Sequence, residues 1–168
     1  LMYGGEGLDD PNWETEFART ANTRLEQWYD FAVENYGKGR EDRGYIDDWF
    51  DSKVNRTLKE VREAMDETAF RTAIQRGYFD MQNYLRWYLR RARRLNRESV
   101  SRFIEVQTLV LVPFVPHLCE EIWEKIGKQG FISQVAYPES DDSKINESVE
   151  RAEEYLKGLI EDINEILK

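Results

Sequence analysis

The sequence predicts an all-α fold, an antiparallel bundle of five to six helices. Apolar residues recur every three or four positions along most of the 168-residue chain, which is the spacing of one helix face. Glycine, proline, asparagine and aspartate interrupt this spacing at intervals, as they do at helix ends. Only residues 131–137 depart from it, and there we expect a loop with at most a short strand-like segment. Helices joined by short connections pack as antiparallel neighbours.

The first expected helix follows a glycine-rich opening. Residues 1–10 contain three glycines and predict a junction from a missing upstream domain, so the helical domain is expected at residues 11–168. Asp10 and Pro11 suit the cap and the first helical position, and Gly37 suits the end. The apolar stripe between them consists of Phe17, Ala21, Leu25, Trp28, Ala32 and Tyr36.

A polar turn rich in glycine, residues 37–45, separates the first helix from the second. Asp47 or Asp48 is expected to cap the second helix. Its apolar stripe then runs from Phe50 to Met65 at helical spacing.

Asp66 is expected to cap a third helix, which is long and continues into an arginine-rich stretch at residues 86–102. Gly77 lies within its apolar stripe. Because glycine weakens a helix, we expect a close helix–helix contact at Gly77.

A fourth helix is expected to begin at Asn96 or Ser99. It leads into residues 109–127, LVLVPFVPHLCEEIWEKIG, where two prolines break an apolar run and an amphipathic helix follows. This segment predicts a buried corner between two helices, ended by Gly127. A last long helix is expected from about residue 145; it reaches the final residue without a terminating glycine, so we expect the natural chain to continue.

The charge of the chain is unevenly distributed. The net charge is −9, yet residues 86–102 carry seven arginines and one glutamate. No apolar run is long enough to span a membrane, and no secretion signal is present. The single cysteine, Cys119, excludes an internal disulfide and predicts a small core residue in a cytoplasmic protein.

The sequence offers no catalytic constellation, and we expect no catalytic residue, metal ligand or cofactor in this chain. His117 is the only histidine, and it is expected to play a structural part at a helix start. Glu120 and Glu121 are adjacent and therefore point to different sides of a helix. No glycine-rich phosphate-binding loop is present.

The arginine-rich stretch is the candidate binding site. If the third helix persists to residue 97, five arginines fall on one side of it, because successive residues are rotated by about 100°. Trp87 borders this stripe and could stack on an exposed base. A row of guanidinium groups suits the phosphates of a nucleic-acid backbone; charged stripes are also often only solvated faces. The predicted nucleic-acid-binding residues are Arg86, Trp87, Arg90, Arg93, Arg94 and Arg97.

Residues 113–123, PFVPHLCEEIW, resemble the P-F-x-P-H-x-x-E-E-[LI]-W run in the anticodon-binding domain of class I aminoacyl-tRNA synthetases. That run is shared by the leucyl, isoleucyl, valyl and methionyl enzymes. Residues 1–17 and 131–138 resemble segments of the archaeal and eukaryotic leucyl-tRNA synthetases, which favours the leucyl group within this class.

The resemblance implies a tRNA-binding helical domain of a leucine–tRNA ligase, with tRNA(Leu) and the missing catalytic and C-terminal domains as partners. It implies ATP with Mg for the full-length enzyme, whose H-I-G-H and K-M-S-K-S motifs are absent here. Two alternatives remain open: the same domain of an isoleucyl, valyl or methionyl enzyme, or a helical protein-interaction module.

Overall fold

The computed structural model describes residues 14–167, and it confirms the all-α prediction. Asp10, Pro11 and the predicted junction lie outside the described residues. The elements are α1 (Thr15–Asn35), α2 (Tyr45–Asp66), α3 (Phe70–Ile74), the π-helical turn η1 (Gln75–Asp80), α4 (Met81–Arg91), α5 (Arg97–Leu111), α6 (Pro116–Lys125), the 3₁₀ turns η2 (Ile132–Gln134) and η3 (Asp142–Lys144), and α7 (Glu147–Ile166).

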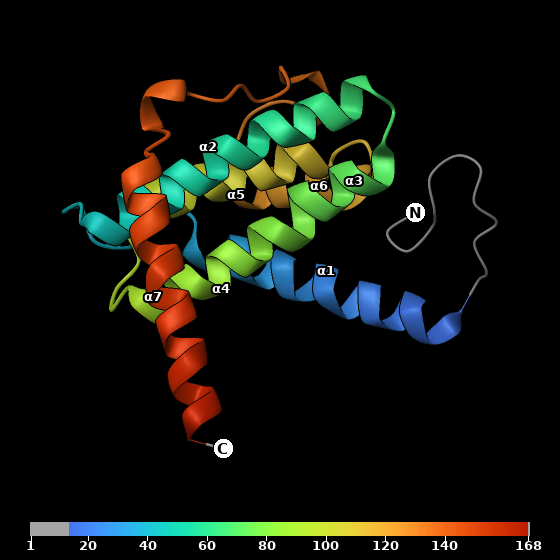
Figure 1. Cartoon of the computed structure of the whole chain (residues 1–168). Helices are drawn as coiled ribbons and strands as arrows, with labels where there is room; N and C mark the ends of the chain where they lie inside the picture. The colour runs from blue at the N-terminus through green and yellow to red at the C-terminus, as the bar shows by residue number, and fades with distance from the viewer. Residues whose placement is uncertain (1–13, 168) are drawn as a thin grey trace.

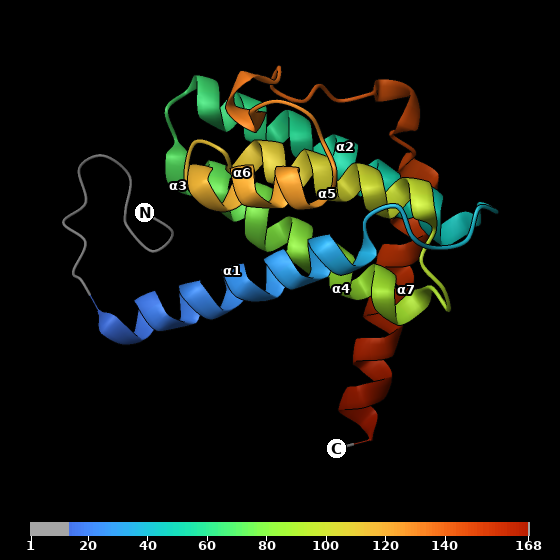
Figure 2. The ribbon, with the colours of Figure 1, turned by 180° about the vertical axis from the view of Figure 1, so that it is seen from behind.

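The helices pack around α5. Helix α2 lies along one side of α5, α6 folds back beside it, and α1 crosses the opposite side of the bundle (Figures 1 and 2). Helices α3, η1 and α4 form one continuous rod across α2. Helix α7 crosses the end of this bundle, and its second half extends beyond it (Figures 1 and 2). None of the helices in residues 14–167 combines the length and apolar character that a bilayer crossing requires.

The core is rich in aromatic side chains. Phe50 stacks on Tyr88 with ring centroids 4.5 Å apart, and its ring lies 5.0 Å from that of Phe103. Trp28 meets Phe103 edge to face at 5.7 Å. Such large rings remove much apolar surface from water, which is the main stabilising contribution to a bundle. Trp28, which belongs to the predicted stripe of the first helix, is buried, and so are Trp49 and Trp123.

The proline corner between α5 and α6 forms as the sequence predicts. Pro116 occupies the first turn of α6, and Gly127 has a φ of +82° just after its end. Cys119 is fully buried, and burial raises the pKa of its thiol to about 12, so it remains protonated. The Glu120 carboxylate accepts hydrogen bonds from the backbone N–H groups of Ile132 (2.8 Å) and Ser133 (3.2 Å), which fixes η2 against the corner.

The close contact predicted at Gly77 is confirmed. A Cβ atom there would lie 2.5 Å from Cγ1 of Val110 on α5, so only glycine allows this approach. The Gln107 side-chain amide donates to the Gly77 carbonyl oxygen at 3.1 Å. The π-helical turn that contains Gly77 was not predicted, since one extra residue in a helical turn leaves no mark on a coarse apolar pattern.

The predicted caps of the second and third helices are wrong. Gly44 occupies the cap position of α2, and Asp47 lies three residues inside the helix, where its side chain accepts from the Gly44 N–H at 2.7 Å. Asp66 is the last residue of α2. The third helix begins at Phe70, after Thr68 has turned the backbone with a φ of +58°.

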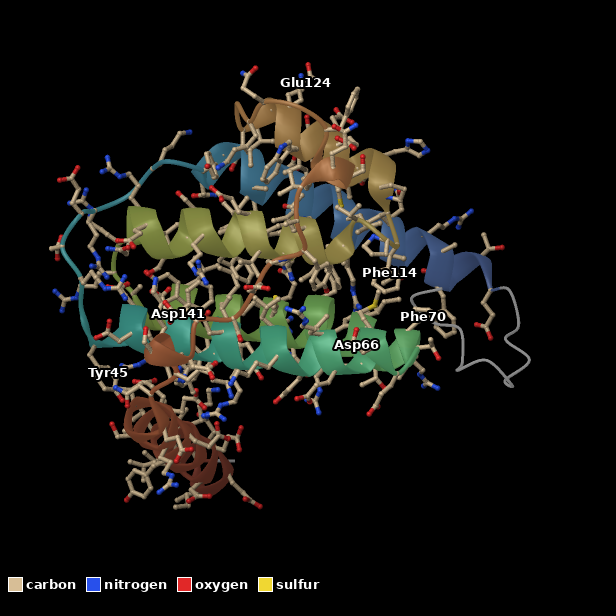
Figure 3. The ribbon with its side chains drawn as sticks, turned by 90° about the horizontal axis from the view of Figure 1, so that it is seen from above. Tyr45, Asp66, Phe70, Phe114, Glu124 and Asp141 are labelled. Atoms are coloured by element: carbon tan, nitrogen blue, oxygen red, sulfur yellow. The ribbon has the colours of Figure 1, made fainter. Side chains whose placement is uncertain are left out.

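The third helix continues into the arginine-rich stretch, as predicted, but it ends there at Arg91 and does not persist to residue 97. The segment after α6 contains the turn η2 and extended residues on either side, with no strand in residues 14–167. This segment crosses α2, where the N–H of Asp141 donates to Oδ1 of Asn55 at 2.8 Å (Figure 3). Figure 3 also places Phe70 and Phe114 at one end of the bundle and Tyr45 at the other.

Candidate nucleic-acid interface

The arginine-rich stretch spans a helix junction. Helix α4 ends at Arg91, residues 92–96 form a turn, and α5 begins at Arg97. The Asn96 side chain accepts from the N–H of Ser99 at 3.0 Å, which confirms Asn96 as the predicted cap of this helix. A helix start at residue 97 requires the preceding helix to end first, so the five arginines do not form one helical stripe.

A buried carboxylate holds this junction together. Asp47 is fully buried and accepts two hydrogen bonds from Nη2 of Arg40, at 2.7 and 2.8 Å. The Tyr88 hydroxyl donates to Oδ1 of Asp47 at 2.5 Å and accepts from the N–H of Asn96 at 3.0 Å. The resulting cluster of Arg40, Asp47, Tyr88 and Asn96, here called the Asp47 cluster, joins three segments that are distant in sequence.

The pKa values within the Asp47 cluster follow from this arrangement. Hydrogen bonding to Asp47 raises the pKa of the Arg40 guanidinium above its ordinary value. Burial, followed by the hydrogen bond to Asp47, raises the pKa of the Tyr88 phenol. Arg40 therefore stays charged and Tyr88 stays a neutral hydrogen-bond donor at physiological pH.

The backbone reinforces the same junction. Arg40 and Asn96 form an isolated parallel β-bridge, in which the Arg40 N–H donates to the Leu95 carbonyl at 2.8 Å and the Arg97 N–H donates to the Arg40 carbonyl at 2.9 Å. Gly39 has a φ of +129°, and a Cβ atom there would lie 2.5 Å from the Leu95 carbonyl oxygen. The turn at residues 92–96 is therefore rigidly placed.

Four arginines at this junction are exposed and have no carboxylate partner among residues 14–167. Arg86 and Arg90 lie one turn apart on the same side of α4, and Arg93 and Arg94 lie in the turn that follows. Arg86 donates to Asn83, and the Arg90 guanidinium lies 5.7 Å from the centroid of the Trp87 ring. These four arginines are called the arginine surface below.

The two remaining arginines at the junction are paired. Arg97 lies 3.0 Å from Glu41, although both side chains are largely exposed, so this pair is weak. Arg91 bonds to Glu153 of α7 at 3.1 Å, and Glu153 is almost fully buried.

Trp87 lies in the contact between α4 and α7. Its indole N–H donates to Oε2 of Glu153 at 2.8 Å, and the Lys157 ammonium lies 5.2 Å from its ring centroid. The side chain is partly buried. The structure thus gives Trp87 a positioning role beside Arg90, and its predicted stacking on a base stays a prediction.

Other residues singled out in the sequence are placed clearly. His117 lies in the first turn of α6, is exposed and makes no hydrogen bond with any residue of the described part. Glu120 and Glu121 point to different sides of α6, as predicted: Glu120 binds η2, and Glu121 borders a shallow cleft beside Tyr29.

Sequence reasoning missed a cleft between α1 and the α4 rod. Its floor includes Trp28 and Leu85, and its rim carries Arg24, Gln27 and Arg86. The cleft opens beside the arginine surface and adds a second cation, Arg24, from a different helix. The arrangement offers hydrogen-bond donors and positive charge, and it contains no group of acid, base and nucleophile.

A family model described as the anticodon-binding domain of tRNA ligase matches residues 47–168. The match extends from the Asp47 cluster through α7. The chain belongs to this family of anticodon-binding domains.

The relatives within this family are leucine–tRNA ligases, which confirms the leucyl resemblance. The chain is 45% identical to the leucine–tRNA ligase of Aeropyrum pernix over 99% of its length, and 36% identical to that of Archaeoglobus fulgidus over 100%. It spans only 18% of the length of each relative.

A solved structure shares the fold. A LeuRS from Agrobacterium radiobacter K84, in a ternary complex with tRNA and LeuAMS, superposes with a TM-score of 0.66 over 81% of this chain and 18% of that chain. Sequence identity is 16%, so this likeness shows the helical architecture alone.

Proposed function

We propose that the chain is the tRNA-docking domain of a leucine–tRNA ligase and that it binds tRNA phosphates through the arginine surface. The observation that supports this is the presence, at one junction of a protein with a net charge of −9, of four exposed guanidinium groups that have no carboxylate partner in residues 14–167. Arg97, weakly paired and next in line, belongs to the same proposed contact, and Trp87 positions Arg90 within it.

Phosphate contact explains the composition of this site better than base readout does. A guanidinium group binds phosphate oxygens through two parallel hydrogen bonds, and a row of them follows a backbone. The acidic remainder of the chain repels polyanions, so an RNA would be held only at this face. The resemblance to the leucyl enzymes implies that this domain docks the body of the tRNA, and contact with backbone phosphates suits that role.

The activity belongs to the full-length protein. We infer that it joins leucine to tRNA(Leu) using ATP and Mg in the cytoplasm, with the chemistry performed by parts of the protein outside this chain. The relatives are ligases several times longer than the chain, and the described helices contribute binding groups only.

Charge reversal of the arginine surface tests the proposal. The variant Arg90→Glu/Arg94→Glu should weaken tRNA binding by at least about tenfold at moderate salt. Each arginine that neutralises a phosphate releases a counterion on binding, and the variant loses this favourable contribution at both positions. The slope of log Kobs against log salt should become shallower by about one for each phosphate that is no longer neutralised.

The matched control is Arg19→Glu/Arg151→Glu, which changes the net charge equally at two exposed sites on α1 and α7. It should change binding far less than the junction variant does. Circular dichroism should show unchanged helicity for both. Equal losses of tRNA affinity in the two variants would mean that only the net charge of the chain matters, which would contradict the arginine surface as a site. Unchanged binding in both variants would favour the alternative of a protein-interaction module.

A further inference from the structure

Helix α7 has two unlike halves. The first half is anchored to α2 and α4 by polar contacts: Glu150 bonds to Arg56 at 2.8 Å, Glu153 bonds to Trp87 and Arg91, and Lys157 lies 5.1 Å from the Trp49 ring centroid. After Lys157, no side chain in the described part of α7 makes a hydrogen bond, ion pair or ring contact with the bundle. The second half extends past the bundle (Figures 1 and 2).

From Tyr155 onward, α7 nevertheless carries a stripe of large apolar side chains. At 100° per residue, four of them fall within an arc of about 80°. Their exposed fractions are 75% for Tyr155, 42% for Leu159, 47% for Ile163 and 83% for Ile166. A stripe of this kind is what a helix presents to a neighbouring element, and exposed contiguous apolar residues mark interaction surfaces. We call these four residues the α7 stripe.

The charge beside the α7 stripe is negative. Residues 158–167 contain Glu161, Asp162 and Glu165 and no basic residue. A second copy of α7 would bring like charges together, which disfavours self-association, and an anionic lipid surface would be repelled for the same reason. The charge therefore selects a partner that is apolar in the centre and basic at the rim.

Gly158 supplies an independent observation. It lies inside α7, where glycine costs stability relative to alanine, and a Cβ atom built on it would meet nothing within 4 Å. Gly77 shows the contrasting case, because there the close approach of α5 requires glycine. Among residues 14–167 Gly158 has no neighbour that requires glycine, which fits a close approach by a surface outside this part of the protein.

We propose that the α7 stripe docks a basic, apolar-centred surface supplied by the rest of the full-length protein, with the closest backbone approach at Gly158. This inference rests on the proposed function only in taking the chain as one domain of a longer ligase. The chain spans 18% of its relatives, so most of the polypeptide is available to supply that surface. A tethered partner also benefits from a high effective concentration.

Hydrogen exchange tests this docking. Amides of residues 155–167 should exchange at least about tenfold more slowly in the full-length protein than in the 168-residue chain, because docking suppresses local opening. The protection should fall as salt is raised, since the rim contacts are electrostatic. Equal exchange rates in the two proteins would overturn the proposal, as would protection that appears only with rising concentration of the short chain, which would indicate a second copy.

Three variants of the full-length protein sharpen the test. Leu159→Ser/Ile163→Ser should abolish the protection of residues 155–167, whereas Asn164→Ser, on the opposite side of α7, should retain it. Gly158→Ala should raise the Tm of the short chain by about 2–4 °C while reducing protection in the full-length protein. A substitution that raises the Tm and leaves protection intact would contradict close approach at Gly158.

The tRNA affinity of the short chain separates this inference from the proposed function. Leu159→Ser/Ile163→Ser should leave that affinity unchanged, because the stripe lies outside the arginine surface. If residues 155–167 are unprotected while binding still depends on Arg90 and Arg94, the docking inference fails and the proposed function stands.

Discussion

The two ends of α5 are held by opposite kinds of interaction. At its start, the α4–α5 junction is fixed by a buried ion pair and a chain of hydrogen bonds centred on Asp47. At its end, the α5–α6 corner is fixed by two prolines and by buried apolar side chains such as Ile122 and Trp123. The proposed RNA contact lies at the first end.

The difference teaches how a bundle can present a charged surface. Apolar packing is non-directional and tolerates small shifts, whereas a bidentate ion pair fixes distance and angle. Arginine side chains that must meet phosphates need a fixed backbone beneath them. The polar junction supplies this geometry, and the apolar corner contributes stability through burial.

The largest effect is expected from breaking the polar junction. Asp47→Ala removes both carboxylate acceptors of the half-buried Arg40 guanidinium and leaves the buried Tyr88 hydroxyl without its acceptor, and removing one partner of a largely buried pair costs about 3–5 kcal/mol. Urea unfolding should show this loss. At temperatures where the variant remains folded, tRNA binding should also weaken, because the turn that carries Arg93 and Arg94 loses its support.

Ile122→Ala is the control at the apolar corner. Deleting a fully buried isoleucine side chain costs about 2–5 kcal/mol, so the loss of stability is of similar size. The folded variant should bind tRNA as the unmodified chain does. If both variants weakened binding equally, the polar junction would have no special part in positioning the arginines.

A smaller effect is expected from two glycines that both have positive φ. Gly39→Ala should cost about 2–3 kcal/mol, because it combines a strained backbone with a Cβ atom 2.5 Å from the Leu95 carbonyl oxygen. Gly127→Ala, at the end of α6, meets nothing within 4 Å and should cost only about 1–2 kcal/mol from backbone strain. Thermal unfolding of the two variants measures the difference, and a larger loss at Gly127 would contradict the comparison.

The smallest effect concerns pH at the apolar corner. Partial burial acts to raise the pKa of Glu120, but the hydrogen bonds from Ile132 and Ser133 prevail and hold it below its usual 4.5. Because the folded pKa is depressed, these bonds stabilise the fold above pH 4.5, and the stabilisation is lost as the pH falls through the folded value.

Glu120→Gln should therefore flatten the acid side of the stability curve, because the variant lacks the charge-dependent stabilisation near pH 7 and matches the unmodified chain at low pH. Acid titration followed by tryptophan fluorescence would show this, since Trp123 lies on the same helix as Glu120. An acid limb that is identical in the variant would contradict the assignment.

The apolar parts of the fold were predictable and the polar junction was not. The stripe of α1, the proline corner and the close contact at Gly77 all follow from the spacing of apolar residues and of glycine. Asp47 looked like a helix cap, because sequence spacing shows only local partners. Its main partner on α4, Tyr88, lies 41 residues away.

The local structure predicted for the arginine-rich stretch was wrong, because a helix junction stands where one continuous helix was expected. The run of arginines permits a continuous helix, since arginine is a good helix former. The predicted cap at Asn96 argued against that continuous helix, because a helix that starts at Arg97 requires the preceding helix to end before it. The pairing of Arg91 and Trp87 with Glu153 depended on where α7 packs, which no local pattern encodes.

The bond between Arg91 and Glu153 has a consequence for the RNA face itself. Glu153 acts as an internal counter-ion for Arg91, which lies at the margin of the arginine surface. While this ion pair is formed, the Arg91 guanidinium is not free to bind an RNA phosphate. Any movement that lifts α7 would expose one more positive charge at the junction together with the indole of Trp87. The position of α7, which is distant from α4 in sequence, therefore changes the electrostatic potential at the surface where an RNA would bind.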